Sequence, residues 1–241
     1  MGIAAALTLC AACANPPGQA AAPSRRHPTS GSASTPAQPA GDPPSVQLPP
    51  AATDTPAPPH APTEAIGPAY VFPIRGCRSS YAHAHHDYPA TDIFAAPGCA
   101  FVAVTSGRVD EVSPTDSWSS RDNAGPTRGG LSVSVVGADG VRYYGSHLSV
   151  IAQGVMPGDR VAAGQLLGRV GDSGDARGLG THVHFGISWP TAPGRWWIRR
   201  GELFPGPYLD AWAAGARRSP AVAVRALRTR MGLEPACHVL C

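Results

Sequence analysis

The sequence predicts a mainly β fold, in which an antiparallel β-sheet domain is followed by a short helical C-terminal extension. From Tyr70 onward, short apolar segments with alternating polarity are separated by glycine turns, which is typical of strands. No long segment with helical periodicity occurs before residue 208. Two helical patterns follow that point, the second beginning at Pro220. The chain is therefore expected to place its strands first and its helices last.

The expected strands can be placed in chain order. A short strand is expected at residues 101–104, after a turn. A hairpin is expected over residues 131–148, because two alternating segments flank an Ala-Asp-Gly turn. Residues 158–171 predict two more short strands, and residues 181–188 predict another. The long loop at residues 113–130 is a candidate cover for a functional groove, since long loops in compact domains are often functional.

The first 14 residues predict an export leader. The stretch "MGIAAALTLCAACAN" is too short for a membrane span, which needs about 20 apolar residues, and resembles the apolar region of a secretory signal. Two processing sites compete. Cleavage before Cys13 would leave a lipidated N-terminus, although Cys10 stands where a bacterial lipobox usually has Leu. Cleavage after Ala14 satisfies the small-x-small rule.

Residues 15–65 are predicted to form a disordered tether. They hold 14 of the 27 prolines and no aromatic residue, so they cannot bury enough apolar surface to fold. The whole chain has a formal net charge of +3 and no basic stripe with interleaved aromatic residues, which argues against a nucleic-acid partner. Its lysine-free composition, rich in Ala, Pro, Gly and Arg, is typical of GC-rich bacterial genomes.

Four cysteines lie beyond the leader, and an even number in an exported protein predicts disulfides. A bond between Cys77 and Cys99 would close a loop of roughly 20 residues and contribute about 3 kcal/mol on the chain-entropy model. A bond between Cys237 and Cys241 would pin the C-terminus. A zinc site built from the four cysteines is the weaker alternative, because neither pair has two-residue spacing.

Histidines provide the candidate chemistry. In the strand expected over "THVHF", residues i and i+2 point to the same side, so His182 and His184 share one face. Two imidazoles on one rigid face suit a metal site, or one ligand beside one general base, whereas two solvated histidines are the alternative. The stretch "HAHHDYPATDIFA" (83–95) offers three histidines and two aspartates at a turn before a strand. His147 lies late in the second strand of the expected hairpin.

Five pieces of sequence, in this order, resemble the lysostaphin-type (LytM-domain) zinc metallopeptidases. The pieces are "HHDYPATDIFA", "PGCAFVAVTSGRV", "YYGSHLS", "PGDRVAAGQLLGRVGDSG" and "THVHFGIS", which together span about half of the chain. The resemblance implies a duplicated-hybrid-motif fold. It also implies zinc ligands at Asp92, at His184 and at a histidine before Asp92. His147 and His182 would form the catalytic pair that does not bind the metal.

The first ligand departs from the family pattern, which has three residues between this histidine and the aspartate. Counting back from Asp92, that position is Tyr88. We expect His86 to reach the metal instead, through a loop that is longer by two residues. The alternatives are His85, then His83, and the intrusion of Asp87.

The resemblance implies an exported zinc metalloendopeptidase that hydrolyses peptide cross-links of bacterial peptidoglycan, with stem peptides and cross-bridges as its partners. Zinc would supply a water of lowered pKa, while His182 or His147 would move protons and steady the developing oxyanion. The alternative is a non-catalytic envelope protein that binds peptidoglycan or activates another hydrolase. A biotinyl or lipoyl carrier domain is excluded, because the chain has no lysine to modify.

The sequence thus divides into a leader (1–14), a tether (15–65), the metallopeptidase domain (66–198) and a helical extension (199–241). The protein is expected in the cell envelope, either anchored to the membrane through the lipid or secreted. An aromatic, arginine-rich stretch joins the last two regions. Its aromatic side chains line a cleft or pack the helices onto the β domain, and we favour packing. These aromatic residues are Trp196, Trp197, Tyr208 and Trp212.

Overall fold

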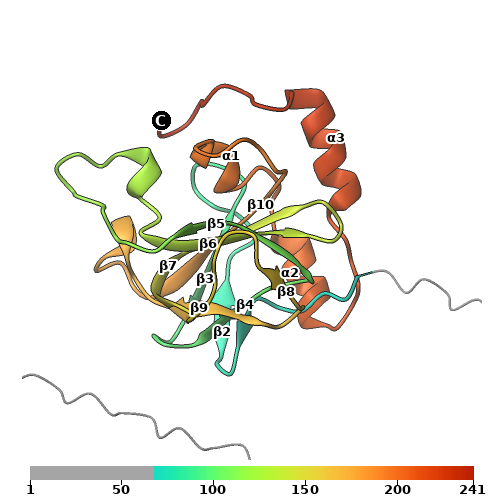
Figure 1. Ribbon diagram of the computed structural model, residues 1–241, viewed down its shortest axis with the longest axis horizontal. Coiled ribbons are helices and arrows are strands. Elements are labelled where there is room, and N and C mark those ends of the chain that lie inside the picture. Colours follow the sequence, from blue (N-terminus) through green and yellow to red (C-terminus); the bar gives the residue numbers. More distant parts are fainter. Residues whose placement is uncertain (1–67) are drawn as a thin grey trace, which may run out of the picture. The chain divides into compact units, whose positions relative to one another are not determined.

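The computed structural model describes residues 68–241 (Figure 1). The expected leader, the tether and the lipidation site at Cys13 lie outside the described residues and stay predictions. Within the described part of the chain, no helix is both long enough and apolar enough to cross a membrane. The β strands form a mainly antiparallel sheet, which confirms the predicted fold class.

The strands of the described residues join into one ten-stranded sheet, which is nearly barrel-shaped (Figure 1). The expected hairpin, the two short strands after it and the strand carrying "HVH" are all present. In chain order the strands are β1 (Ile74–Arg75), β2 (Ser79–Tyr81), β3 (Thr91–Ala95), β4 (Ala100–Val102), β5 (Gly107–Ser113), β6 (Leu131–Gly137), β7 (Arg142–Ile151), β8 (Arg160–Val161), β9 (Leu166–Val170) and β10 (His182–Ser188).

Strand β7 is the hub of the sheet. Its first half pairs with β6 and β10, and its second half pairs with β9. The register shifts on both sides of Leu148, in the pairings with β6 and with β9. Such irregularities bend a strand and re-aim its side chains. Here the bend falls next to His147, one of the candidate site residues.

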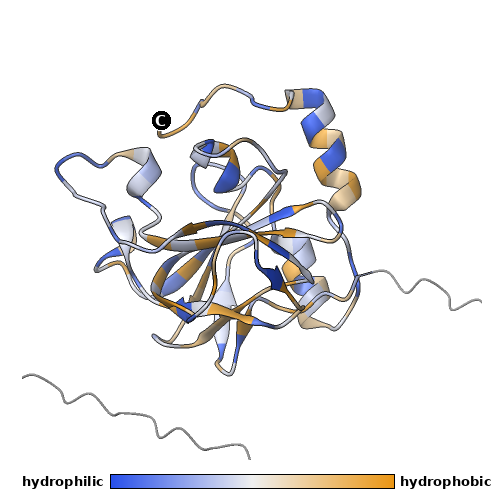
Figure 2. Cartoon of the chain, viewed as in Figure 1, coloured by the Kyte–Doolittle hydropathy of each residue, from blue (hydrophilic) through white to orange (hydrophobic). Residues whose placement is uncertain are grey.

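The interior of the sheet is filled by the apolar face of each strand, as the alternation predicts. Phe101, Val183 and Phe185 are buried there. Gly145 permits the close packing, because a Cβ atom at this position would lie 2.2 Å from the ring of Phe101. Figure 2 shows hydrophobic and hydrophilic residues mixed along the strands, as expected for a sheet with one buried face.

Both expected disulfides are present in the structure. The Cys77–Cys99 bond joins the segment between β1 and β2 to the turn before β4. The Cys237–Cys241 bond closes a small ring at the C-terminus.

Three short α-helices follow the sheet: α1 (Trp196–Arg199), α2 (Gly206–Ala213) and α3 (Ala221–Met231). The two helices expected after residue 208 correspond to α2 and α3, and Pro220 is the N-cap of α3 as predicted. The sequence did not predict the four-residue α1. This helix spans the expected boundary between residues 198 and 199, so that boundary cuts through an element that lies against β10.

Helix α1 is fastened to the sheet by a network of charges. Arg142 is only 1% exposed and pairs with Asp110 at 2.7 Å between Nε and Oδ2. Glu111, the neighbour of Asp110, pairs with both Arg142 and Arg199 of α1. A buried guanidinium requires such partners, because an unpaired buried charge is costly. The network therefore holds α1 beside the strands that carry the histidines.

Candidate active site

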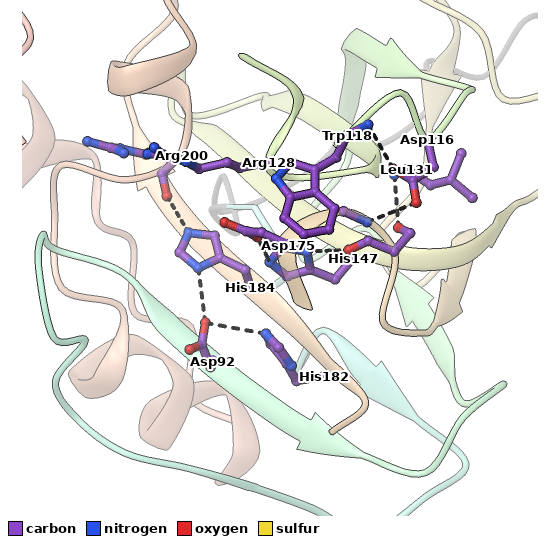
Figure 3. Close-up of polar contacts among 12 residues, drawn as sticks. Asp92, Asp116, Trp118, Arg128, Leu131, His147, Asp175, His182, His184 and Arg200 are labelled. Carbon is purple, nitrogen blue, oxygen red and sulfur yellow. Dashed lines mark hydrogen bonds and ion pairs between the residues drawn. The ribbon is translucent and has the colours of Figure 1, made fainter. Parts of the chain in front are cut away.

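The pairing of β3 with β10 brings the first two candidate residues together. In this antiparallel register, Asp92 lies directly opposite His184. The Oδ1 atom of Asp92 is 3.0 Å from Nδ1 of His184 (Figure 3). The two residues are 92 positions apart in sequence, so the contact depends entirely on the sheet. The strand that the alternation predicted around His182 and His184 is present as β10.

His182 and His147 complete the cluster. The Nε2 atom of His182 is 4.0 Å from Oδ1 of Asp92, and its ring centroid is 4.9 Å from that of His147. His147 comes from the bend in β7 and has a φ of 63°, a left-handed conformation that is uncommon for a residue other than glycine. Its backbone N–H donates to the carbonyl of Gly129, which helps to hold this conformation.

Each of the three histidines uses one ring nitrogen on a backbone carbonyl. Nδ1 of His147 is 2.8 Å from the oxygen of Ser173, and Nδ1 of His182 is 2.8 Å from the oxygen of Gly180. In His184 the assignment is reversed, with Nε2 lying 3.0 Å from the carbonyl oxygen of Arg200. A carbonyl only accepts, so each of these nitrogens carries the proton. In a neutral imidazole, the other nitrogen then offers its lone pair to the site.

The structure separates the two candidates for the first ligand. Nε2 of His85 is 3.8 Å from Oδ2 of Asp92, and its ring centroid is 5.0 Å from that of His184. The side chain of His85 is 4% exposed, whereas that of His86 is 72% exposed and bonds its neighbour Asp87. Potential ligand atoms of His85, His86 and Asp92 all lie within 4.8 Å of one another. The burial and the contact with His184 favour His85 over His86.

His83 and Tyr88, which the sequence also places near the first ligand, take different positions. His83 bonds Asp210 at 3.2 Å, at an exposed position beside Tyr81. Tyr88, which occupies the position where the family pattern has the histidine, does reach the site, since its hydroxyl is 3.5 Å from Nε2 of His184. Burial raises the pKa of Tyr88, so its hydroxyl keeps its proton at neutral pH.

Burial and mutual charge set the protonation of the cluster. Burial lowers the pKa of His85 to about 4 and that of His147 to about 3, and the nearby His184 adds to both shifts. These two imidazoles are therefore neutral at pH 7. Burial alone would raise the pKa of Asp92, but its hydrogen bond to His184 and the surrounding histidines outweigh burial and hold the pKa below its usual range. Asp92 is therefore a carboxylate.

The donor set formed by His85, Asp92 and His184 fits a zinc ion. His184 donates its Nε2 proton to the backbone carbonyl of Arg200. A neutral His184 therefore has no second proton for the contact between its Nδ1 and Asp92. A cation between Nδ1 and the carboxylate would satisfy both. His85 adds a buried Nδ1 without a hydrogen-bond partner among the described residues. Two histidines and one carboxylate are a donor set that catalytic zinc sites use, with a backbone carbonyl orienting a ligand histidine from behind.

The cluster opens into a cavity of about 300 Å³. Residues from the loop at 113–130 form part of its wall, as expected for a loop beside a functional groove. The lining residues come from six separate segments of the described chain: His85, His86, Tyr88, Asp92, Phe94, Gly125, Pro126, Arg128, Gly129, Tyr144, Ser146, His147, Asp175, Ala176, Leu179, His182, His184, Trp196, Arg199, Arg200 and Leu240.

The aromatic stretch that includes α1 and α2 has both of the roles that the sequence left open. Tyr208 and Trp212 are buried in the core, and Trp212 stacks on Tyr70 at 5.5 Å, which agrees with the packing interpretation. Trp196 instead lines the cavity, where Gly125 approaches it so closely that a Cβ atom would lie 2.1 Å from the indole. The preference for packing was therefore wrong for Trp196.

The comparison with known protein families matches the segment of the chain that carries most of the site. Residues 86–194 match the model of Peptidase family M23, and this range contains Asp92, His147, His182 and His184. The matched range begins at His86, so it leaves the choice of first ligand to the geometry. No curated protein matches the chain.

Solved structures similar to the chain include the catalytic domain of the antimicrobial peptidase lysostaphin from Staphylococcus simulans, with 23% identity, 55% of this chain and 92% of that chain covered, and a TM-score of 0.42. Intact lysostaphin is 25% identical, with 58% of this chain and 51% of that chain covered and a TM-score of 0.44. A LytM protein from Ruminococcus gnavus gives 25% identity, coverage of 62% of each chain and a TM-score of 0.45. The chain thus spans about half the length of intact lysostaphin.

Proposed function

We propose that this protein is an exported zinc metallopeptidase that hydrolyses peptide bonds in bacterial peptidoglycan. One observation carries the proposal: Asp92 and His184 face each other across paired strands, in a cavity that also holds His85, His147 and His182. The match to a peptidase family over residues 86–194, which contain all of these residues except His85, supports peptide-bond hydrolysis. Export and the peptidoglycan substrate rest on the apolar leader and on the family resemblance.

The proposed zinc ligands are Asp92, His184 and His85. When bound, zinc would act as a Lewis acid on a peptide carbonyl and would lower the pKa of a water molecule from 15.7 towards roughly 7. The chain prepares the ligands for this role. Asp92 stays ionised and His85 stays neutral at pH 7, and the carbonyl of Arg200 fixes the tautomer that leaves Nδ1 of His184 free.

His147 and His182 are the proposed proton carriers. Each donates its Nδ1 proton to a backbone carbonyl at 2.8 Å, so its Nε2 lone pair faces the cavity. A neutral imidazole held in this way can accept a proton from an attacking water and return it to the leaving amine. Once protonated, either ring can donate to the oxygen on which negative charge develops.

The competing function is a non-catalytic envelope protein that binds peptidoglycan. Such a protein needs the cavity but not the ionised and neutral donors that converge in it. The test is therefore hydrolysis. The full chain is incubated with peptidoglycan, with and without a zinc chelator, and released fragments are identified by mass spectrometry. His184→Ala is the test variant, and His83→Ala is the matched control because His83 is exposed and its ring contacts Asp210 rather than the cluster.

We expect defined peptides to be released by the wild type and by the control variant, and not by His184→Ala or after chelation. The masses identify the bond that is cut. If the zinc-loaded wild type releases nothing while still sedimenting with peptidoglycan, the protein is a binder and the catalytic proposal fails.

A further inference from the structure

The C-terminal tail, residues 232–241, crosses the rim of the cavity. Five side chains of the preceding domain fasten it, and each contact but one is to a backbone carbonyl. The contacts are Trp189 Nε1 to the oxygen of Leu233 at 2.8 Å, Arg195 Nε to Glu234 Oε2 at 2.8 Å, Trp197 Nε1 to the oxygen of Pro235 at 2.9 Å, Arg200 to the oxygen of Val239, and Arg128 Nη1 to the oxygen of Leu240 at 2.8 Å. The tail therefore follows α1 up to the site and ends there.

The last five residues form a ring closed by the Cys237–Cys241 disulfide, and we call residues 237–241 the terminal ring. Its side chains are largely exposed, and Leu240 alone of the ring lines the cavity. The terminal ring is thus held by polar contacts rather than by apolar burial. Segments of this kind open at low free-energy cost, because they bury little apolar surface.

The two arginines that hold the terminal ring have acidic residues nearby, Asp175 for Arg128 and Glu202 for Arg200, but no carboxylate of the described chain in direct contact. Neither Arg128 nor Arg200 forms an ion pair within 4.0 Å in the described range, 68–241, although Arg199 beside them pairs with Glu111. Among the described residues, the guanidinium of Arg128 donates hydrogen bonds to the neutral oxygens of Asn123 and Leu240. Guanidinium groups that line a cavity are best satisfied by carboxylates, which they bind through short, charge-assisted hydrogen bonds.

Arg200 is held ready for such a partner. Its guanidinium lies over the ring of Tyr88 at 3.9 Å and over the ring of Trp196 at 5.1 Å, so two aromatic faces fix its plane. Its Nε is buried and has no hydrogen-bond partner among residues 68–241. Within residues 68–241, its side chain donates a hydrogen bond to the carbonyl of Val239 in the terminal ring.

Both guanidinium groups converge on one small region beside the proposed metal site. Val239 and Leu240 are consecutive, and consecutive Cα atoms lie about 3.8 Å apart. Arg128, Arg200 and His184 line the same cavity. The nearby carboxylate of Asp175 lies with Oδ1 3.9 Å from Nε2 of His147, and it interacts with the charge of Arg128 without forming an ion pair within 4.0 Å.

We propose that Arg128 and Arg200 form a subsite for a carboxylate of the peptide substrate, and that the terminal ring occupies this subsite with the carbonyl oxygens of Val239 and Leu240. The inference rests on the proposed peptidase function, because it assigns the class of substrate: a peptide with a free carboxylate close to the bond that is cut. The carboxylate is either the C-terminal group of the peptide or a side-chain group. Such a ligand displaces the terminal ring, since a charged acceptor binds a guanidinium more strongly than a neutral carbonyl does.

The test measures binding, so it does not depend on hydrolysis. Three probes are titrated calorimetrically into the full chain, before and after chelation: acetyl-trialanine with a free C-terminus, the same peptide as its amide, and an amidated peptide in which the middle residue is glutamate. A second chain ends at Ala236 and lacks the terminal ring. A third carries Arg128→Gln and Arg200→Gln in this shortened chain. Arg195→Gln is the matched control, because it releases Glu234 without removing an arginine from the cavity.

We expect the shortened chain to bind at least one acidic peptide about tenfold more tightly than the full chain does, and about tenfold more tightly than it binds the amide. The acidic peptide that binds better identifies the source of the carboxylate. The double arginine variant loses this discrimination, whereas Arg195→Gln keeps it. Near-ultraviolet circular dichroism checks that each variant is folded, and Arg200→Lys in the shortened chain, which keeps the charge, restores part of the discrimination.

If the shortened chain binds the three peptides with affinities that agree within twofold, the subsite proposal is overturned. Discrimination that survives the loss of both arginines also overturns it. The two proposals can fail separately. If the shortened chain discriminates between acidic and amidated peptides but no zinc-dependent hydrolysis is found, the subsite proposal stands and the peptidase proposal fails. If hydrolysis is found without this discrimination, the peptidase proposal stands and the subsite proposal fails.

Discussion

The imidazole of His184 and the backbone carbonyl of Arg200 are hydrogen-bonded at 3.0 Å, which links β10 to the end of α1. Gly186 makes this contact possible. It lies two residues after His184 on the same face of the strand, and a Cβ atom there would lie 2.1 Å from the oxygen of Arg200. The glycine that ends the stretch "GTHVHFG" therefore lets a carbonyl approach and fix the tautomer of a proposed zinc ligand.

Gly186→Ala is expected to weaken zinc binding by about 10-fold to 100-fold, because the added methyl group pushes the carbonyl of Arg200 away from Nε2 of His184. The measurement is a competition titration with a chromophoric zinc chelator. Val183→Ala is the control. Val183 is fully buried on the opposite face of β10, so its truncation costs stability without touching the ligands. Equal zinc affinities in the two variants would show that the carbonyl does not orient the ligand.

The choice between the two adjacent histidines gives a second prediction. His85→Ala is expected to lower zinc affinity at least about 100-fold, since it removes a ligand, whereas His86→Ala changes it less than about threefold. The physical reason is that His85 is buried against Asp92 and His184, while His86 is exposed. Zinc content after dialysis and competition titration both report the result. The reverse order of effects would identify His86 as the ligand.

The sequence predicted the parts of the site that depend on strand periodicity. A two-residue alternation places His182 and His184 on one face whatever the loops do, and antiparallel pairing then brings Asp92 opposite His184. His147 was found from its place in a predicted hairpin, although its left-handed backbone was not. These residues lie on or at the ends of strands, where position follows from pattern.

The remaining parts of the site have no such pattern. His85 and His86 lie in an irregular segment, where no period decides which side chain turns inward. Arg200 contributes a backbone carbonyl to His184, and every residue type carries that group. Arg128 and Trp196 come from a loop and from a four-residue helix, and their meeting at one cavity depends on tertiary packing alone. The arginine-rich composition near residue 200 was the one sequence signal for this part of the site, and it did not indicate which of these side chains point into the cavity.

Asp116 provides a third prediction, about the positioning of His147. Its Oδ2 accepts hydrogen bonds from the backbone N–H of Gly174 at 3.0 Å and from Arg177 at 2.7 Å. Ser173, which precedes Gly174, supplies the carbonyl that fixes the tautomer of His147. Asp116→Ala is therefore expected to loosen this turn and to lower the rate of peptide release about tenfold while zinc content stays unchanged.

Asp122→Ala, an exposed change in the same loop, serves as the control and is expected to leave the rate unchanged. Asp116→Asn keeps one acceptor oxygen and should restore part of the rate. A loss of zinc in Asp116→Ala would contradict the assignment, because it would indicate a general disturbance of the site rather than of His147.

Glu202 provides a prediction about stability and pH. Burial raises the pKa of this carboxyl from its ordinary value of 4.5 to about 7, and the charge of Arg200 only partly opposes the shift. The folded state therefore holds its proton more tightly than the unfolded state does. The free energy of unfolding contributed by this group falls as the pH rises from about 4.5 to about 7, and above pH 7 the full cost of the buried carboxylate is present.

Glu202→Gln is expected to raise the free energy of unfolding at pH 8 by about 1–2 kcal/mol, a value reduced from the full pKa shift because the side chain is partly exposed. The gain should shrink as the pH is lowered and disappear below about pH 4.5, where the wild-type carboxyl is already neutral in both states. Denaturant titrations at pH 4, 6 and 8 measure the difference. Asp122→Asn, at an exposed loop position, should change the free energy by less than about 0.5 kcal/mol at each pH. A gain from Glu202→Gln that does not vary with pH would mean that packing, rather than the buried charge, determines its effect.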